Sequence, residues 1–186
     1  RSGTPSYRCR EKHASAVHAT IRFVEFVSCK EEFLMSVQLR RYTGVDKPTV
    51  ELFEVTSAQG AFVEPLRETL AMGANRDCFV IEADGEPVGF FQIDHASATR
   101  SVEVHLELHE VTIDWRHQGK KYGKAFVEML PRLLNAEYPD WRGVCLTVNC
   151  RNEKAKRLYE YGGFTDTGEL KLDGPSGPQH IMRRAI

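Results

Sequence analysis

The chain has 186 residues, of which 41% are hydrophobic, and this length suits one domain with a sizeable core. Its formal net charge is −1, so no overall field attracts nucleic acid or an anionic membrane. The sequence has no apolar run of about 18 residues that would span a membrane. It also has no basic segment followed by an apolar one at its N-terminus, as a secretion signal would have. We therefore expect a globular protein with no nucleic-acid and no membrane partner.

The cysteines and histidines indicate a reducing compartment and no metal. The five cysteines are odd in number and lack C-x-x-C spacing, so we expect free thiols and a cytoplasmic location. Seven histidines are present, and His105 and His109 would share one face of a strand without completing a ligand set. The cysteines are Cys9, Cys29, Cys78, Cys145 and Cys150.

Residues 1–34 differ from the rest of the chain. They begin without a clear hydrophobic period, and residues 17–27 fit a strand or a helix equally well. We interpret Met35 as the natural start, since Lys30-Glu31-Glu32 fits a purine-rich run of the kind that precedes bacterial start codons. Residues 1–34 would then be translated leader sequence, and 35–186 would form the domain. The alternative is a genuine extension that packs on the domain or on a partner.

The domain begins with an expected edge strand at residues 36–42, followed by two helices. Asp46 is the expected N-cap of the first helix, and Pro48 falls in its first turn. Apolar residues at helical spacing predict the second helix over residues 62–72, which Gly73 ends.

Two strands follow at residues 78–82 and 88–94, and Asp84-Gly85 between them is a strong hairpin signal. Residues 102–113 predict a long strand, in which apolar residues alternate through Leu108 and resume at Val111. The alternation slips by one residue there, and such a slip indicates a β-bulge.

The stretch from Gln118 to Lys124 joins this strand to a helix over residues 122–134, in which Pro131 should cause a kink or a restart. A glycine-bearing turn of this kind is an anion site, because the first N–H groups of a helix lack internal partners and carry its positive dipole end. Cations are unfavourable there, so the basic side chains around the turn suggest an anionic ligand. These are Arg116, Lys120, Lys121 and Lys124. The alternative is a solvated lysine-rich turn.

The remaining segments predict a buried strand at residues 144–148, a helix at 152–161, and a final hairpin of 164–172 with 179–184. The whole order predicts an α+β fold, in which a mixed, mostly antiparallel sheet carries helices on both faces.

A second motif occupies residues 152–159, which read Asn-Glu-Lys-Ala-Lys-Arg-Leu-Tyr, with Gly162-Gly163-Phe164 close behind. With the turn, this motif makes the chain resemble the GCN5-related N-acetyltransferase (GNAT) family from about Met35 to the C-terminus. The family signature is Arg/Gln-x-x-Gly-x-Gly/Ala, followed by Asn-x-x-Ala-x-x-Leu-Tyr and Gly-Phe. Here the first part reads Gln118-x-x-Lys121-x-Gly123, so Lys121 replaces a glycine, and the second part matches in full.

The resemblance implies the GNAT fold, with a bulged central strand that splays from its neighbour to admit acetyl-CoA as co-substrate. It implies that backbone N–H groups of the turn hold the pyrophosphate, where Gly119 and Gly123 let the chain approach closely. The pantetheine arm would pair with two backbone positions of the strand, as an added strand does. The implied cofactor-binding residues are Val111, Ile113, Gln118, Gly119, Lys120, Lys121, Tyr122, Gly123, Lys124 and Asn152.

The resemblance also implies two catalytic residues. Tyr159 matches the tyrosine that faces the cofactor sulfur, and its phenol can protonate the leaving thiolate; the alternative is a core tyrosine. Glu107 matches a glutamate that acts through water as general base; the alternative is a solvated polar face. His109 and Glu110 are the reserves for the base.

We therefore expect an N-acetyltransferase that transfers an acetyl group from acetyl-CoA to a primary amine of an unidentified acceptor. A small molecule is favoured, and homodimerisation is left open. One alternative is an acyl-CoA-binding regulatory module without turnover, which the presence of Tyr159 and a strand glutamate argues against. Another is a toxin-like acetyltransferase of aminoacyl-tRNA, which the near-neutral charge argues against.

Overall fold

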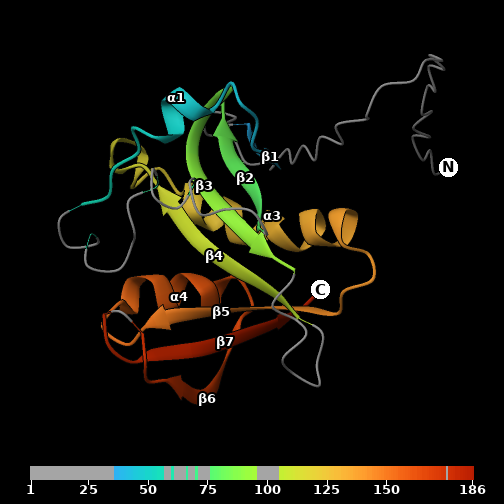
Figure 1. Cartoon of the computed structure of the whole chain (residues 1–186), viewed down its shortest axis with the longest axis vertical. Helices are drawn as coiled ribbons and strands as arrows, with labels where there is room; N and C mark the ends of the chain where they lie inside the picture. The colour runs from blue at the N-terminus through green and yellow to red at the C-terminus, as the bar shows by residue number, and fades with distance from the viewer. Residues whose placement is uncertain are drawn as a thin grey trace, which may run out of the picture.

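The structure is a computed structural model that describes residues 36–56, 60, 66, 70, 76–95, 105–174 and 176–186. The expectations for residues 1–34, for 102–104 and for most of the second helix lie outside these residues, although Leu66 and Leu70 of that helix are described and helical. The elements, labelled as in Figure 1, are β1 (Val37–Arg41), α1 (Lys47–Val50), β2 (Arg76–Ala83), β3 (Glu86–Asp94), β4 (Leu106–Ile113), the short 3-10 helix η2 (Trp115–His117), α3 (Tyr122–Glu137), β5 (Gly143–Asn149), α4 (Glu153–Tyr161), β6 (Thr165–Lys171) and β7 (Gln179–Ala185).

The strands form one seven-stranded sheet in the order β1-β2-β3-β4-β5-β7-β6. Neighbouring strands are antiparallel except β4 and β5, which are parallel. The mixed, mostly antiparallel sheet is therefore confirmed, with β1 at one edge as predicted. The hairpin between β2 and β3 is confirmed too, and Asp84 and Gly85 both have positive φ, as its tight turn requires.

Two apolar clusters lie on opposite faces of the sheet, because side chains alternate along each strand. The larger cluster contains Phe79 and Phe91, which stack with ring centroids 5.1 Å apart, and it packs against α3 and α4. The smaller cluster contains Val80 and Phe90 and packs against Val50 of α1. Helices therefore cover both faces, as predicted. We call these the α3 face and the α1 face.

The first predicted helix is a single turn, and Asp46 precedes it as expected. The Asp46 side chain, however, does not cap the helix. Its carboxylate lies 2.8 Å from Nη2 of Arg40 and accepts the backbone N–H of Thr43 over 2.7 Å. The hydrogen bond from Arg40 holds the pKa of this buried carboxyl below its usual value. Asp46 therefore fixes the segment that leads into α1 rather than the helix end.

A kink or a restart was predicted at Pro131; helix α3 continues through it as one helix, so the restart does not occur. A proline has no N–H, and the carbonyl of Val127 one turn earlier lacks its usual helical donor. Nη1 of Arg184, from β7, donates to this carbonyl over 3.1 Å. The same guanidinium nitrogen donates to the carbonyl of Gly162 at the end of α4. A side chain distant in sequence thus replaces the missing donor.

The predicted bulge in β4 is confirmed. Phe90 lies opposite Thr112, whereas Gln92 lies opposite His109, so β4 has one residue more than β3 in this interval. Glu110, within the bulge, has a φ of +52°. The bulge keeps the apolar side chains of β4 on the α3 face along its whole length.

Candidate active site

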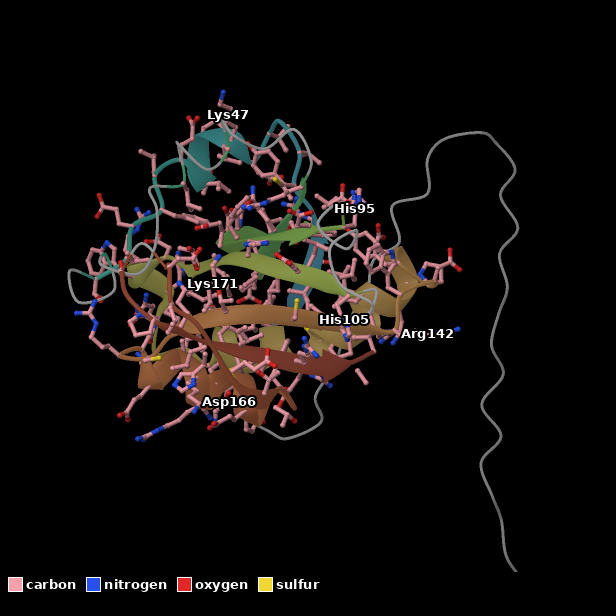
Figure 2. The ribbon with its side chains drawn as sticks, turned by 60° about the horizontal axis from the view of Figure 1, so that its bottom comes forward. Lys47, His95, His105, Arg142, Asp166 and Lys171 are labelled. Carbon is pink, nitrogen blue, oxygen red and sulfur yellow. The ribbon has the colours of Figure 1, made fainter. Side chains whose placement is uncertain are left out.

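Strands β4 and β5 pair only where they begin. Among the described residues their last pair is Glu107 with Cys145, and the two ribbons diverge beyond it (Figure 1). His105 and Arg142 lie close together at the end of the sheet where both strands start (Figure 2). A Cβ on Gly143 would meet the His105 ring at 2.5 Å, so the strands approach closely there. The strand pair is V-shaped, with its vertex at Glu107 and Cys145.

Beyond the bulge, β4 turns backbone groups away from β3. The N–H of Asp114 donates to the carbonyl of Val88 over 3.1 Å, and this bond sets the alternation along the strand. The backbone groups of Val111 and Ile113 therefore point toward the open side of the V. The Ile113 carbonyl also accepts Nε2 of Gln118 over 3.0 Å. Both residues present their backbone in the direction that an added strand needs.

The turn before α3 has the geometry of an anion site. Gly119 and Lys121 both adopt left-handed conformations, with φ of +81° and +65°. The N–H groups of Lys124 and Ala125 both donate to the Lys121 carbonyl, which places Lys121 directly before the helix. Within the described part of the chain, the N–H groups of residues 119–123 have no hydrogen-bond partner. Such orphan donors at a helix N-terminus suit a phosphate group.

The basic side chains around the turn divide into two kinds. Lys120 and Lys121 are exposed at its tip. The Lys124 ammonium instead lies 4.7 Å from the ring centroid of Tyr161, and Nε of Arg116 donates over 2.7 Å to the buried Asp114. The predicted charge cluster therefore leaves two lysines beside the orphan N–H groups.

Two further residues of the predicted turn, Tyr122 and Gly123, contribute to the packing of α3 rather than to the turn surface. The Tyr122 side chain is buried in the core. A Cβ on Gly123 would lie 3.1 Å from Cδ2 of Leu158, so this glycine lets α3 approach α4. Only their backbone N–H groups face the turn.

Asn152 begins α4 in the predicted way. Its Oδ1 accepts the N–H of Ala155 over 3.2 Å, which makes it the N-cap. In the described structure its amide nitrogen makes no hydrogen bond, so the cap leaves a donor for a ligand.

Tyr159 lies on the face of α4 that packs against the sheet. It is buried, and its ring meets Phe164 edge-on at 5.6 Å between centroids. Burial, followed by the negative charge of Glu110, raises the pKa of the Tyr159 phenol above its usual value. The negative charge of Glu110, which lies within the bulge, thus acts on the predicted acid, and Tyr159 keeps its proton.

Glu107 lies at the vertex on the α1 face, since its neighbours Leu106 and Leu108 belong to the α3 face. Its Oε2 is 3.2 Å from Nε2 of His109, and its side chain is 38% exposed. Burial and then the charge of Glu107 raise the pKa of the Cys145 thiol to about 11, so this cysteine is a neutral neighbour. The structure brings the predicted base, Glu107, and one reserve, His109, together. The charge of the other reserve, Glu110, acts on Tyr159 instead.

Sequence reasoning missed two residues at this point. Cys145 and Arg183 lie opposite one another on β5 and β7, beside Glu107. The order of strands decides this proximity, and no motif in the sequence marks it.

The described residues contain no group of three or more histidine, cysteine or acidic side chains placed to hold a metal ion. Within the same part of the chain, no helix has both the length and the apolar character needed to cross a membrane.

Residues 74–166 match the family described as acetyltransferase (GNAT) domain. The chain is also 32% identical over 158 residues to the uncharacterized N-acetyltransferase YbbJ of Bacillus subtilis (strain 168), and the match covers 81% of this chain and 98% of that relative. The chain belongs to the GNAT family.

Solved structures agree with this GNAT assignment. The aminoglycoside acetyltransferase AAC(6')-Ib in complex with coenzyme A superposes with a TM-score of 0.64 at 21% identity, over 81% of this chain and 95% of that one. Spermidine N-acetyltransferase from Vibrio cholerae, in complex with CoA and spermine, gives a TM-score of 0.63 at 20% identity, over 80% and 95%. These likenesses confirm the predicted fold. The protein is an N-acetyltransferase of amines with acetyl-CoA as co-substrate.

Proposed function

We propose that this GNAT enzyme acetylates a small primary amine that approaches the vertex of β4 and β5 from the α1 face. The position of Glu107 carries the proposal, because its partly exposed carboxylate stands where the two strands separate. A primary ammonium has a pKa near 10.4, so the acceptor must lose a proton before it attacks. Glu107 takes that proton through a water molecule, as general base.

The open side of the V, between the diverging ends of β4 and β5, would hold the co-substrate, which supplies an activated acetyl thioester. The orphan N–H groups of residues 119–123 bind its pyrophosphate, with Lys120 and Lys121 adding positive charge. The backbone of Val111 and Ile113 pairs with the pantetheine arm, and the Asn152 amide donates to the same arm.

Tyr159 is the proposed general acid. Its phenol remains protonated because burial and Glu110 raise its pKa, so it has a proton to give when a thiolate leaves. Burial also excludes water, which would otherwise compete as the donor.

The test is release of free thiol from acetyl-CoA in the presence of a panel of amines. The panel contains small monoamines, amino acids, polyamines, an aminoglycoside and an aminoacyl-tRNA, and a reaction without protein is the blank. We expect turnover with small amines. Binding of acetyl-CoA without turnover of any amine would favour the regulatory module, and turnover with aminoacyl-tRNA alone would favour the toxin-like enzyme.

Two further proposals concern the setting of the domain. The thiols of Cys78, Cys145 and Cys150 are free, which fits a reducing compartment such as the cytoplasm.

Because β1 begins at Val37, we propose that the domain starts at Met35. Protein shortened to this start should bind acetyl-CoA as the full chain does. An insoluble product would instead assign residues 1–34 to the fold.

A further inference from the structure

A row of side chains crosses the α1 face at the vertex, one from each of four strands. The register places Glu107 between Asp94 of β3 and Cys145 of β5. It places Cys145 in turn opposite Arg183 of β7. Residues opposite one another in adjacent strands project from the same face of a sheet. Arg183 therefore lies on the same face as Glu107, two strands away.

The electrostatics of Cys145 support this arrangement independently. The negative charge of Glu107 raises the pKa of the thiol, and the positive charge of Arg183 lowers it, so both side chains act on the same group. Adjacent strands lie about 4.8 Å apart, which puts the backbones of Glu107 and Arg183 about 10 Å from each other. Cys145 is short, so β5 itself places no long side chain between the two charges at this level.

The helices that the structure describes leave this side of the vertex uncovered. Helices α3 and α4 pack on the other face, and α1 packs over β2 and β3 through Val50. In the described part of the molecule, no helix packs on β5 and β7 at the α1 face. Arg183 is exposed on the same face of the sheet as Glu107, two strands away. A guanidinium is thus carried by the face at which the amine is proposed to lie.

We propose that the acceptor carries a carboxylate besides its amine, and that Arg183 binds this carboxylate while the amine lies at Glu107. The inference rests on the proposed function, because Glu107 marks the place of the amine. The planar guanidinium offers two parallel N–H donors that fit the two oxygens of a carboxylate. The two backbones are about 10 Å apart and both side chains extend from them, so an amino acid of a few carbons can bridge the two end groups. A polyamine would bring a second cation against Arg183 and is disfavoured.

The test compares amines that differ only at the far end. Aminoalkanoates from glycine to 6-aminohexanoate are each matched with the alkylamine and the diaminoalkane of the same chain length. We expect the wild-type enzyme to prefer an aminoalkanoate over both partners in kcat/KM. A phosphate-ended amine, such as phosphoethanolamine, is a further arm, and preference for it over every aminoalkanoate would overturn the carboxylate assignment.

Variants of Arg183 give the sharper result. Arg183→Gln should raise KM for the aminoalkanoate about tenfold, change kcat by less than about twofold, and leave KM for the alkylamine unchanged. Arg183→Glu should reverse the preference toward the diaminoalkane. Arg157→Gln is the matched control, because Arg157 is 77% exposed on α4 and pairs with Glu153, and it should change none of these constants. Equal losses with both kinds of amine, or no loss at all, would overturn the proposal.

A binding experiment separates this inference from the proposed function. Calorimetry with protein saturated with coenzyme A measures aminoalkanoate binding without turnover. Binding that Arg183→Gln weakens, together with no acetylation of any amine, would support the carboxylate site and contradict the proposed reaction. Acetylation of all amines alike, with no effect of Arg183→Gln on binding, would support the reaction and overturn the carboxylate site.

Discussion

The two ends of β4 offer different kinds of groups to ligands. Before the bulge, β4 is paired with β5, and the Glu107 side chain projects at the vertex. After the bulge, Val111, Ile113 and the turn that follows offer backbone N–H and C=O groups instead. Glu110, whose φ is +52°, lies where one kind of site changes into the other.

This difference determines how each end responds to substitution. A backbone site keeps its donors under any side chain that tolerates the local φ, and Lys121 occupies the left-handed position where the signature has glycine. A side-chain site depends on particular atoms, such as the carboxylate of Glu107 or the hydroxyl of Tyr159. We therefore expect large effects on catalysis at the vertex and small effects on binding at the turn.

The largest effect is expected at Tyr159. Tyr159→Phe removes the proposed proton donor and little packing, so kcat should fall by about 10²–10⁴ while acetyl-CoA binding persists. Tyr161→Phe is the control on the same helix, because Tyr161 is 54% exposed and its hydroxyl donates to the surface residue Glu128. Steady-state kinetics and calorimetry measure the two quantities. An unchanged kcat in Tyr159→Phe, with chemistry shown to limit the rate, would remove Tyr159 from the mechanism.

The pH profile of the wild-type enzyme sharpens this prediction. Burial and Glu110 raise the pKa of Tyr159 above its usual value of about 10, so the acid remains protonated through that pH. The kcat of the wild type should therefore stay level to about pH 10, and any loss should begin above it. Glu110→Gln removes one of the two causes and should move this upper limit to lower pH. A limit that stays in place would show that Glu110 does not act on Tyr159.

The next effect is expected at Glu107. Glu107→Gln should lower kcat/KM by about 10² at pH 6–7, where the acceptor is mostly ammonium and needs a base. Raising the pH should partly restore the rate, because solvent then removes the proton. Tyr159→Phe should show no such recovery, since its missing proton is needed at the sulfur. If Glu107→Gln follows the wild-type profile instead, the base is elsewhere, and His109→Gln and Glu110→Gln are the next variants to measure.

Much of the fold could be predicted because its signals are local. The slip of alternation at Leu108 and Val111 predicted the bulge, and Asp84-Gly85 predicted the hairpin that the structure contains. These features depend on neighbours within a few residues. The turn motif pointed to the unpaired N–H groups of residues 119–123, but the N–H groups of Gln118 and Lys124, also predicted for the phosphate, donate to Trp115 and Lys121. It did not reveal the packing role of Gly123.

Contacts between distant strands could not be predicted in this way. The restart expected at Pro131 does not occur because Arg184, more than fifty residues away, supplies the missing donor. Asp46 occupies the N-cap position of α1, but its side chain does not cap the helix because Arg40 on β1 binds the carboxylate. Arg183 lies two strands from Glu107 only because β7 pairs with β5, and nothing in its local sequence distinguishes it from Arg184.

A smaller effect is expected at the turn from Gly119→Ala. A Cβ at Gly119 would meet nothing within 4 Å, so the cost is only that of a side chain at φ +81°, roughly 1 kcal/mol in folding free energy. Acetyl-CoA binding should weaken by less than about tenfold, because every N–H of the turn remains. Gly44→Ala is the control, since it has the same open space without a positive φ, and it should not destabilise the fold. Equal thermal shifts in both variants would contradict the assignment of strain to Gly119.

The smallest effect, and the only stabilising one, is expected from Lys121→Gly. Lys121 holds φ at +65°, which costs an ordinary residue roughly 1–2 kcal/mol, while glycine loses about 0.4–1 kcal/mol through its freer unfolded chain. The variant should therefore gain up to about 1.6 kcal/mol in unfolding free energy. Lys120→Gly removes the same charge at a position without positive φ, so it should lose stability.

Both lysine variants should weaken acetyl-CoA binding by a similar, salt-dependent factor of a few-fold, because each removes one exposed cation beside the phosphate site. Denaturant unfolding measures the change in stability, and calorimetry at two salt concentrations measures the change in acetyl-CoA affinity. A much larger loss of binding in Lys121→Gly than in Lys120→Gly would show that the Lys121 side chain itself holds the pyrophosphate, and the turn would then be a side-chain site like the vertex.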